Sequence, residues 1–319
     1  MNSLFPPFQR SIHWVKLARV ILFLGIFLGL SEITHAEEVA ILKSADITAY
    51  SEAIVAFKTA LPPAFQVTLE YDLQGDMAKG RSLARRIRAS DAQVVLAVGL
   101  KAAIAAKLEI LDIPVLFCLV LNPEKYGLPT SNMMGLSMDI PFRKHLKPLQ
   151  LLIPKVSRIG VIFDPEKTTA RRDKLQDDAK ALGITILSQE VNSEQEVSEA
   201  LKSLGTRIEA LWLLPDSTVL TKSTLDFLMS TTLEMNIPVV GFSAGIVKSG
   251  AVVSAHLNYE DIGKQAATTV QNLLGRAPHP VLGTILPPDR IHQSINQKAA
   301  QFLGFSLTPD ILRAFDEQY

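Results

Sequence analysis

The sequence predicts an α/β protein made of two doubly wound parallel-sheet lobes that are joined by a hinge of crossing segments. Three observations predict this fold. The chain has 319 residues, a length typical of about two domains. Short apolar runs rich in β-branched residues alternate with amphipathic helical stretches, and the alternation restarts after Ile140-Pro141. Such a pattern is typical of parallel sheets with helices on both faces, because parallel strands are joined by right-handed crossovers.

In the first half of the chain, each expected strand is an apolar run that ends at a polar residue or a glycine. The expected strands are residues 39–43, 67–71, 94–98, 115–120 and 133–138. The helices between the first four strands are expected at residues 50–60, 77–89 and 102–111. Asp76 stands directly before the second helix, where a carboxylate is a favoured N-cap. The basic residues from Lys79 to Arg88 lie on that helix and are expected to form its solvated face.

The second half repeats the same rhythm. Its expected strands are residues 158–163, 184–189, 210–214, 239–242 and 251–255. Its expected helices are residues 143–152, 169–182, 194–204 and 223–235, followed by a helix at 260–274. Trp212 lies inside one of these strands, so we expect it in the core rather than in a binding site.

The chain is expected to cross between the two lobes at three points. Pro141 restricts the backbone of the residue before it and ends the first passage. Further crossings are expected near Leu257–Tyr259, where a strand gives way to a helix, and near Ala277–Pro280, where two prolines flank a histidine. The expected domains are a signal peptide at 1–36, a first lobe of 37–140 plus 258–278, and a second lobe of 141–257 plus 279–319.

The N-terminus has the pattern of an export signal. Residues 1–19 carry three basic side chains and no acidic one, and residues 20–30 form an unbroken apolar run. Thr34-His35-Ala36 then supplies a cleavage site. The run is shorter than the about 20 residues that span a bilayer, so we expect a cleaved signal peptide and a periplasmic protein, with an uncleaved N-terminal anchor as the alternative. No cysteine ends the run, which excludes a lipoprotein anchor.

Composition and motifs argue against several function classes. The 32 basic and 32 acidic side chains balance, whereas nucleic-acid-binding proteins carry a basic excess. The single cysteine, Cys118, lies in an apolar run and leaves no internal disulfide or Cys-x-x-Cys metal site. The histidines lack metal-site spacing, and the sequence lacks nucleophile-elbow and phosphate-binding motifs. We therefore expect no catalytic residues, no metal, no cofactor and no nucleic-acid partner.

The candidate ligand site is expected between the lobes. In open parallel sheets, ligands bind beyond the carboxyl ends of the strands, and facing lobes bring two such edges around one cleft. Tyr50 and Phe242 are expected to stack on a ring of the ligand. The pair Asp216-Ser217 suits the ammonium and carboxylate of one small ligand. Each polar candidate is also an ordinary turn or cap residue, and that alternative stays open. The polar candidates are Ser44, Asp46, Gly99, Asn122, Asp216, Ser217 and Ser243.

An ordered set of motifs along residues 37–319 carries a resemblance to a known family. The motifs are QGD at 74–76, VVLAVG at 94–99, IPVLF at 113–117, NMMGLS at 132–137, RIGVIF at 158–163, LPDS at 214–217, IPVVG at 237–241, GAVVS at 250–254 and YEDIG at 259–263. With them, the chain resembles the ABC transporter substrate-binding proteins related to the tryptophan- and tyrosine-binding components. The resemblance implies the type I periplasmic-binding-protein fold. Two positions depart from the family's pattern: Leu100 stands where members often have Thr or Ser, and Asn122-Pro123 stands where they often have Asp-Pro.

The predicted function is that of the periplasmic solute-binding component of an ABC importer. It captures a small-molecule ligand, with an amino acid favoured, and delivers it to a membrane permease. The alternative is a ligand-sensing module that signals to a membrane receptor such as a histidine kinase. A LacI-type regulator shares the fold, but the export signal and the lack of a helix-turn-helix segment count against it. A secreted enzyme is disfavoured because the sequence shows no acid–base cluster.

Overall fold

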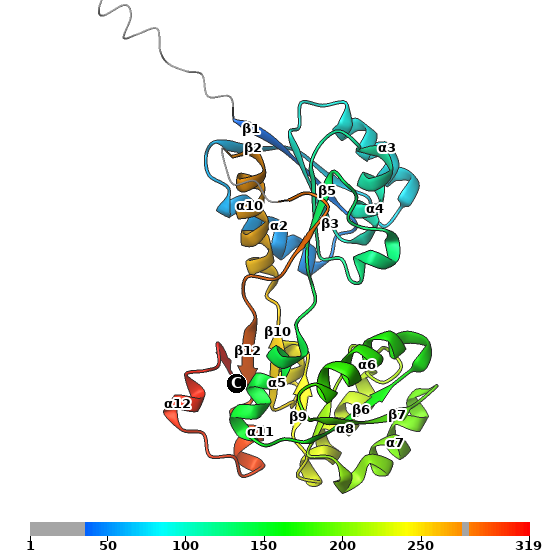
Figure 1. The fold of residues 1–319 in the computed structure, drawn as a ribbon, viewed down its shortest axis with the longest axis vertical. Coiled ribbons are helices and arrows are strands. Elements are labelled where there is room, and N and C mark those ends of the chain that lie inside the picture. The colour runs from blue at the N-terminus through cyan, green and yellow to red at the C-terminus, as the bar shows by residue number, and fades with distance from the viewer. Residues whose placement is uncertain (1–35, 276–280) are drawn as a thin grey trace, which may run out of the picture.

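The structure, a computed structural model, describes residues 36–275 and 281–319, and it consists of two α/β lobes (Figure 1). One sheet has the strand order β11-β5-β4-β3-β1-β2, and the other has the order β13-β12-β10-β9-β8-β6-β7. Helices cover the faces of both sheets, which confirms the predicted fold class. The expected signal peptide lies outside the described residues except at its last position.

Lobe 1 contains a sheet whose strand pairs are all parallel. Its strands are β1 (Glu37–Lys43), β2 (Phe65–Asp72), β3 (Val94–Val98), β4 (Val115–Cys118), β5 (Met133–Leu136) and β11 (Ile285–Leu286). Helices α2 (Thr48–Ala60) and α10 (Tyr259–Leu274) pack against each other on one face. Helices α3 (Met77–Arg88) and α4 (Leu100–Glu109) cover the other face. A short 3₁₀ helix, η1 (Pro123–Tyr126), follows β4.

Lobe 2 contains a mixed sheet, because β12 runs antiparallel to β10. Its strands are β6 (Arg158–Phe163), β7 (Thr185–Glu190), β8 (Ala210–Trp212), β9 (Val239–Gly241), β10 (Val253–His256), β12 (His292–Ile295) and β13 (Glu317–Gln318). Its helices are α5 (Phe142–Leu152), α6 (Pro165–Lys180), α7 (Val197–Leu204), α8 (Lys222–Glu234), α9 (Ala244–Lys248), α11 (Gln297–Phe302) and α12 (Pro309–Leu312), with 3₁₀ turns η2 (Glu194–Glu196) and η3 (Gly205–Arg207).

Local chemistry explains where several of these helices begin. The Asp76 carboxylate accepts hydrogen bonds from the backbone N–H groups of Ala78 and Lys79, so the predicted N-cap of α3 is confirmed. Helix α6 begins at Pro165, four residues before the predicted start, because Asp164 caps it and proline fits the first helical position. Among the described helices, none combines the length and apolar character needed to cross a bilayer.

Three segments of chain cross between the lobes (Figure 1). The first, residues 137–141, joins β5 to α5, and the second, residues 257–258, joins β10 to α10. The third, residues 287–291, joins β11 to β12. The crossing expected near Ala277–Pro280 lies outside the described residues. Ile285 and Leu286 pair with β5, so these two residues belong to the lobe 1 sheet, whereas lobe 2 was expected to resume at residue 279.

Candidate functional site

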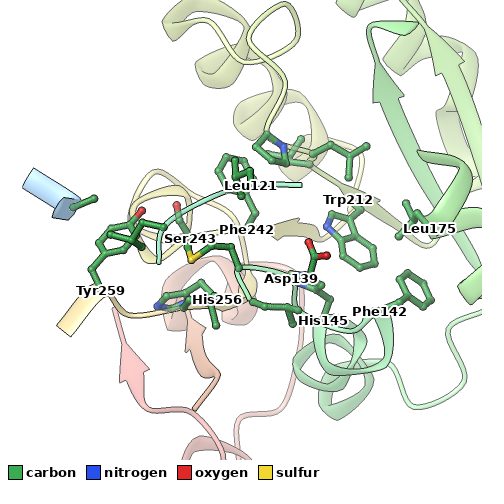
Figure 2. Close-up of a pocket in the computed structure, with 18 of the residues that line it drawn as sticks. Leu121, Asp139, Phe142, His145, Leu175, Trp212, Phe242, Ser243, His256 and Tyr259 are labelled. Atoms are coloured by element: carbon green, nitrogen blue, oxygen red, sulfur yellow. The ribbon is translucent and has the colours of Figure 1, made fainter. Parts of the chain in front are cut away.

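A cavity of about 550 Å³ lies between the lobes (Figure 2). Side chains from both lobes line it, together with the first and second crossings. In lobe 1 they come from the start of α2, the segment after β4 and the first residue of α10. In lobe 2 they come from α5, α6 and the segments that follow β8 and β9. The cavity therefore lies where the carboxyl ends of strands in two parallel sheets face each other, as ligand sites in such folds do.

The lobe 2 wall is built around stacked aromatic rings. Phe142, the first residue of α5, stacks on Trp212 with ring centroids 5.0 Å apart and an interplanar angle of 16°. His145, one turn further along α5, lies against the same indole at 5.1 Å. Trp212 is 3% exposed, so it belongs to the core as predicted, but it also lines the cavity. A flat aromatic surface that is held rigidly by the core suits a ligand with an aromatic or large apolar side chain.

Tyr50 gives the lobe 1 wall its shape. Its ring lies over the start of α4, where Gly99 has a positive φ of 85°. A Cβ at Gly99 would collide with the Tyr50 hydroxyl and would lie 2.8 Å from Ser44 Oγ. Glycine is therefore needed at this position both for its backbone conformation and for the close approach of Tyr50. Burial raises the pKa of Tyr50, so its hydroxyl stays neutral at physiological pH and can donate a hydrogen bond.

Charged groups are found at one edge of the cavity. Asp139, from the first crossing, lies 3.6 Å from Lys174 of α6, measured from Oδ2 to Nζ. Asp178 stands one helical turn after Lys174 and also lines the cavity. Figure 2 shows the Asp139 carboxylate beside the Trp212 ring. This edge therefore offers both signs of charge next to the aromatic surface.

Three of the nine residues that the sequence analysis selected line the cavity, namely Tyr50, Phe242 and Ser243. Ser44 and Gly99 lie behind Tyr50. The Ser44 Oγ accepts a hydrogen bond of 2.9 Å from the Ala102 backbone and so serves the first turn of α4. The structure brings these five residues together but assigns two of them to supporting the wall.

The other four selected residues do not line the cavity. Asp46 is exposed and pairs with Lys43 at 3.0 Å, and this contact lowers the pKa of its carboxyl group. Asn122 adopts a left-handed conformation at the exposed start of η1. Ser217 is exposed. Asn122 and Ser217 fit the interpretation as turn residues that the sequence left open, whereas Asp46 neither lies in a turn nor caps α2, whose N-cap is Ile47.

Asp216 is buried in lobe 2 and has its hydrogen-bonding capacity filled. Its carboxylate accepts hydrogen bonds from Asp164 N at 2.8 Å, Thr168 Oγ1 at 2.9 Å and Thr218 N at 2.9 Å. A fourth comes from Val219 N at 3.2 Å. These contacts tie the segment after β8 to the start of α6. The carboxylate is thus used for holding the wall of the cavity in shape.

The pattern of polar residues at strand ends did not indicate the residues that contribute most to the lobe 2 wall. Phe142, His145, Lys174 and Asp178 lie on helices, and Asp139 lies in a crossing, whereas the selection followed strand ends. The spacing of three or four residues within each helical pair indicates a shared face, and that signal could have identified them. Within the described ranges, no group of His, Cys, Asp and Glu side chains is placed to hold a metal ion.

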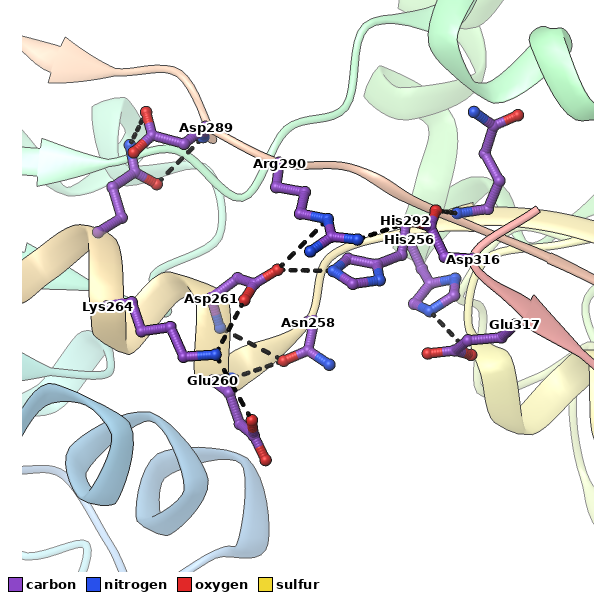
Figure 3. A network of polar contacts seen from close by, with 12 residues as sticks. His256, Asn258, Glu260, Asp261, Lys264, Asp289, Arg290, His292, Asp316 and Glu317 are labelled. Carbon is purple, nitrogen blue, oxygen red and sulfur yellow. Dashed lines mark hydrogen bonds and ion pairs between the residues drawn. The ribbon is translucent and has the colours of Figure 1, made fainter. Parts of the chain in front are cut away.

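A polar network connects the lobes behind the cavity (Figure 3). Asp261 of α10 contacts His292 of β12, with 2.6 Å between Oδ2 and Nε2. Arg290, in the third crossing, lies 3.9 Å from Asp261 and 2.8 Å from Asp316. His256, at the end of β10, lies 3.6 Å from Glu317. Ion pairs therefore connect lobe 1 to lobe 2 beside two of the crossings.

Comparisons with known proteins agree with this geometry. The family described as "ABC transporter substrate binding protein" matches residues 66–318. A tyrosine-binding protein from Clostridioides difficile (strain R20291) is 27% identical over 201 residues, which cover 60% of this chain and 58% of that protein. The chain thus matches less than two thirds of that relative's length.

Solved structures share the fold. The ligand-free, open structure of a substrate-binding protein with adhesive properties from Clostridium difficile matches with a TM-score of 0.76 and 23% identity, covering 88% of this chain and 98% of that one. An ABC domain in complex with L-Trp from Streptococcus pneumonia matches with a TM-score of 0.59 and 18% identity, covering 88% and 99%. Both align along nearly their full length.

Proposed function

This chain belongs to the ABC transporter substrate-binding protein family, and on that premise we propose that it captures an amino acid with an aromatic or large apolar side chain between its lobes. The observation that carries the proposal is the stacked pair Phe142–Trp212, which forms a wall of the interlobe cavity. A cavity of about 550 Å³ accommodates a small ligand rather than a polymer.

Two relatives support the choice of ligand. The relative from Clostridioides difficile is named for binding tyrosine, and the structure from Streptococcus pneumonia contains L-Trp. Both ligands are amino acids with an aromatic ring. The stacked rings of this chain provide a surface of matching chemistry.

The exposure of the cavity wall supports capture by closure. Ile47 and Leu121 line the cavity but are 48% and 54% exposed, so water reaches apolar side chains that a closed form would cover. A ligand held by both lobes binds the closed form better than the open one and shifts the population toward it. Rotation about the three crossings supplies the movement.

We propose that the closed protein delivers its amino acid to an ABC permease from the periplasmic side of the membrane. The family match supports transport. The export signal expected at residues 1–36 supports this location. The same match favours a permease over the sensor kinase that the sequence left as an alternative partner.

The proposal is tested by ligand-induced thermal stabilisation of the purified protein. L-Tryptophan, L-tyrosine, L-phenylalanine and L-leucine are compared with ribose and myo-inositol. We expect a rise in melting temperature with at least one of the amino acids, because a ligand at about 100 times its Kd stabilises by about 2.7 kcal/mol. No shift with any amino acid, or a shift with a sugar alone, would contradict the proposal.

A variant pair connects that response to the aromatic wall. Trp212→Leu keeps an apolar core side chain but removes the stacking surface, and it is expected to weaken binding of the responding amino acid at least tenfold, about 1.4 kcal/mol. Phe302→Leu is the control, because Phe302 is 66% exposed and lies outside the cavity. Equal affinities in the two variants would remove Trp212 from the site.

A further inference from the structure

We propose that Asp139 and Lys174 bind the two charged ends of the amino acid, the ammonium group at Asp139 and the carboxylate group at Lys174. The inference rests on the proposed function and deepens it by naming the groups that recognise the part common to all amino acids. The residues that bind the charged groups are thus assigned to α6 and the first crossing, and not to the strand ends where the sequence predicted them.

The charged side chains around the cavity are confined to one part of its wall. The lobe 1 wall is formed by aliphatic side chains, Tyr50 and Tyr259, and none of its described lining residues carries a formal charge. The acids expected at strand ends are engaged elsewhere, Asp46 by Lys43 and Asp216 by four hydrogen bonds within lobe 2. An ammonium or carboxylate group placed in the cavity therefore finds its opposite charge at the Asp139–Lys174 edge.

The spacing of the two charged side chains matches the spacing of the two charges of an amino acid. A zwitterion carries its two charges a few ångströms apart, and the Asp139 and Lys174 charges are 3.6 Å apart. Both residues line the cavity that Trp212 also lines, and Figure 2 shows the Asp139 carboxylate on the side of the Trp212 ring. An amino acid whose side chain stacks on Trp212 thus has its charged end directed to this pair. Asp178, one turn after Lys174 on α6, provides a second carboxylate in the cavity wall.

A ligand would have to replace the existing ion pair between Asp139 and Lys174. The side chains of Asp139 and Lys174 are 58% and 68% exposed, and an ion pair as exposed as this contributes little to stability. Separating the pair to admit a ligand therefore costs little. Closure then removes water from the new contacts, and the lower local dielectric strengthens both of them.

The position of Asp139 gives this recognition a direct effect on closure. Asp139 lies within residues 137–141, the first crossing, while Lys174 belongs to the body of lobe 2. A ligand bound to both residues fixes the crossing relative to α6. A molecule that lacks the ammonium group is expected to lose this contact and to close the protein less completely.

The experiment combines variants with ligands that lack one charge. Binding of L-tryptophan, tryptamine and indole-3-propionate is measured by calorimetry for the wild type, Asp139→Asn and Lys174→Gln. Asp139→Asn is expected to weaken L-tryptophan and tryptamine on the order of tenfold and to leave indole-3-propionate unchanged. Lys174→Gln is expected to weaken L-tryptophan and indole-3-propionate similarly and to leave tryptamine unchanged. The double variant Asp139→Asn/Asp178→Asn excludes substitution of one carboxylate for the other.

The controls are Asp177→Asn and Lys180→Gln, exposed residues of α6 that do not line the cavity. They remove the same charges from the same helix and are expected to bind all three probes as the wild type does. Wild-type protein that binds none of the probes, and none of the four amino acids of the thermal screen, would count against the proposed function. Wild-type protein that binds L-tryptophan, with variants that weaken all probes equally or match their controls, would overturn the inference alone.

Discussion

Single residues in this protein show how one polar side chain can serve the fold or the ligand. Asp216 follows a strand, carries a charge and stands beside a serine, so the sequence makes it a natural ligand contact. Its 2% exposure and four hydrogen bonds instead make it part of the lobe 2 scaffold. A sequence shows which side chains can bind a ligand, but it does not show which of them the backbone has already engaged.

We therefore expect Asp216→Ala to unfold more easily by about 2–4 kcal/mol, because it leaves the backbone donors Asp164 N, Thr218 N and Val219 N without an acceptor. Ser217→Ala, one residue away on the surface, is expected to change stability by less than about 0.5 kcal/mol. Urea denaturation measures both. If Asp216→Ala is as stable as the wild type but no longer binds the amino acid, Asp216 is a ligand contact and not a scaffold residue.

His256 makes stability depend on pH. Burial lowers its pKa below the usual 6.5, against the opposing effect of Glu317 and with a further lowering by His292. The unfolded chain therefore binds this proton more readily than the folded protein. Stability from this group is fully present above about pH 6.5 and declines as the pH falls toward the folded pKa, by at most about 1.4 kcal/mol per pH unit.

The prediction is that the free energy of unfolding falls between pH 7.5 and 5.5 and that His256→Gln reduces this slope. The neighbouring acids Asp261, Asp316 and Glu317 have lowered pKa values, so their titration lies below this window. Urea unfolding at several pH values provides the measurement. An unchanged slope in the variant would assign the pH dependence to another group.

Whole elements differ in how well the sequence predicts them. Strand β3 begins and ends where predicted, because all five of its residues are apolar and buried. Strands β11 and β13 have two residues each, too short for any periodic pattern to emerge. Strand β12 carries the sequence HQSI and pairs antiparallel to β10, so neither its composition nor the parallel rule indicated it.

Helix α3 shows that the sequence predicts where basic side chains lie but not which acidic residues they contact. Its basic residues were predicted to form a solvated face, and the structure adds partners that lie far along the chain. Arg81 and Arg85 contact Glu109, whose pKa they lower to about 2, and Arg88 contacts Asp112. These two carboxylates offset part of the positive charge that the five basic side chains from Lys79 to Arg88 bring to the face.

The third crossing is fastened to lobe 1 by one buried side chain. Gln265 of α10 donates a hydrogen bond of 2.8 Å to the Pro287 carbonyl and accepts one of 3.2 Å from Asp289 N. These bonds hold the start of the crossing against lobe 1.

Replacing Gln265 with Ala is accordingly expected to increase hydrogen exchange at the Asp289 amide, which loses its acceptor; Pro287 and Pro288 carry no amide proton. Exchange in β6 of lobe 2 is expected to stay at the wild-type rate. Hydrogen-exchange mass spectrometry of the ligand-free protein makes the comparison. Equal protection of the Asp289 amide in both proteins would show that other contacts hold this segment.

At the scale of the whole molecule, the family and the two-lobe fold follow from the sequence, and the resemblance carried by its ordered motifs is confirmed. The position of the cleft also follows, since strand ends of two parallel sheets must face each other. Its composition does not, because helix faces and a crossing supply most of the lobe 2 wall. Those side chains meet only after the lobes have assembled.

The route of the chain through the two lobes determines the order in which they can fold during synthesis. Helix α10 covers one face of the lobe 1 sheet together with α2, yet its residues 259–274 follow more than a hundred residues of lobe 2. Gly263 lets the two helices approach so closely that a Cβ there would meet the Ala53 carbonyl. A nascent chain that ends near residue 141 therefore leaves uncovered the face of α2 that carries Ala53 and Ala56, which the finished protein buries. Lobe 1 begins first but becomes complete only after most of lobe 2 has been made.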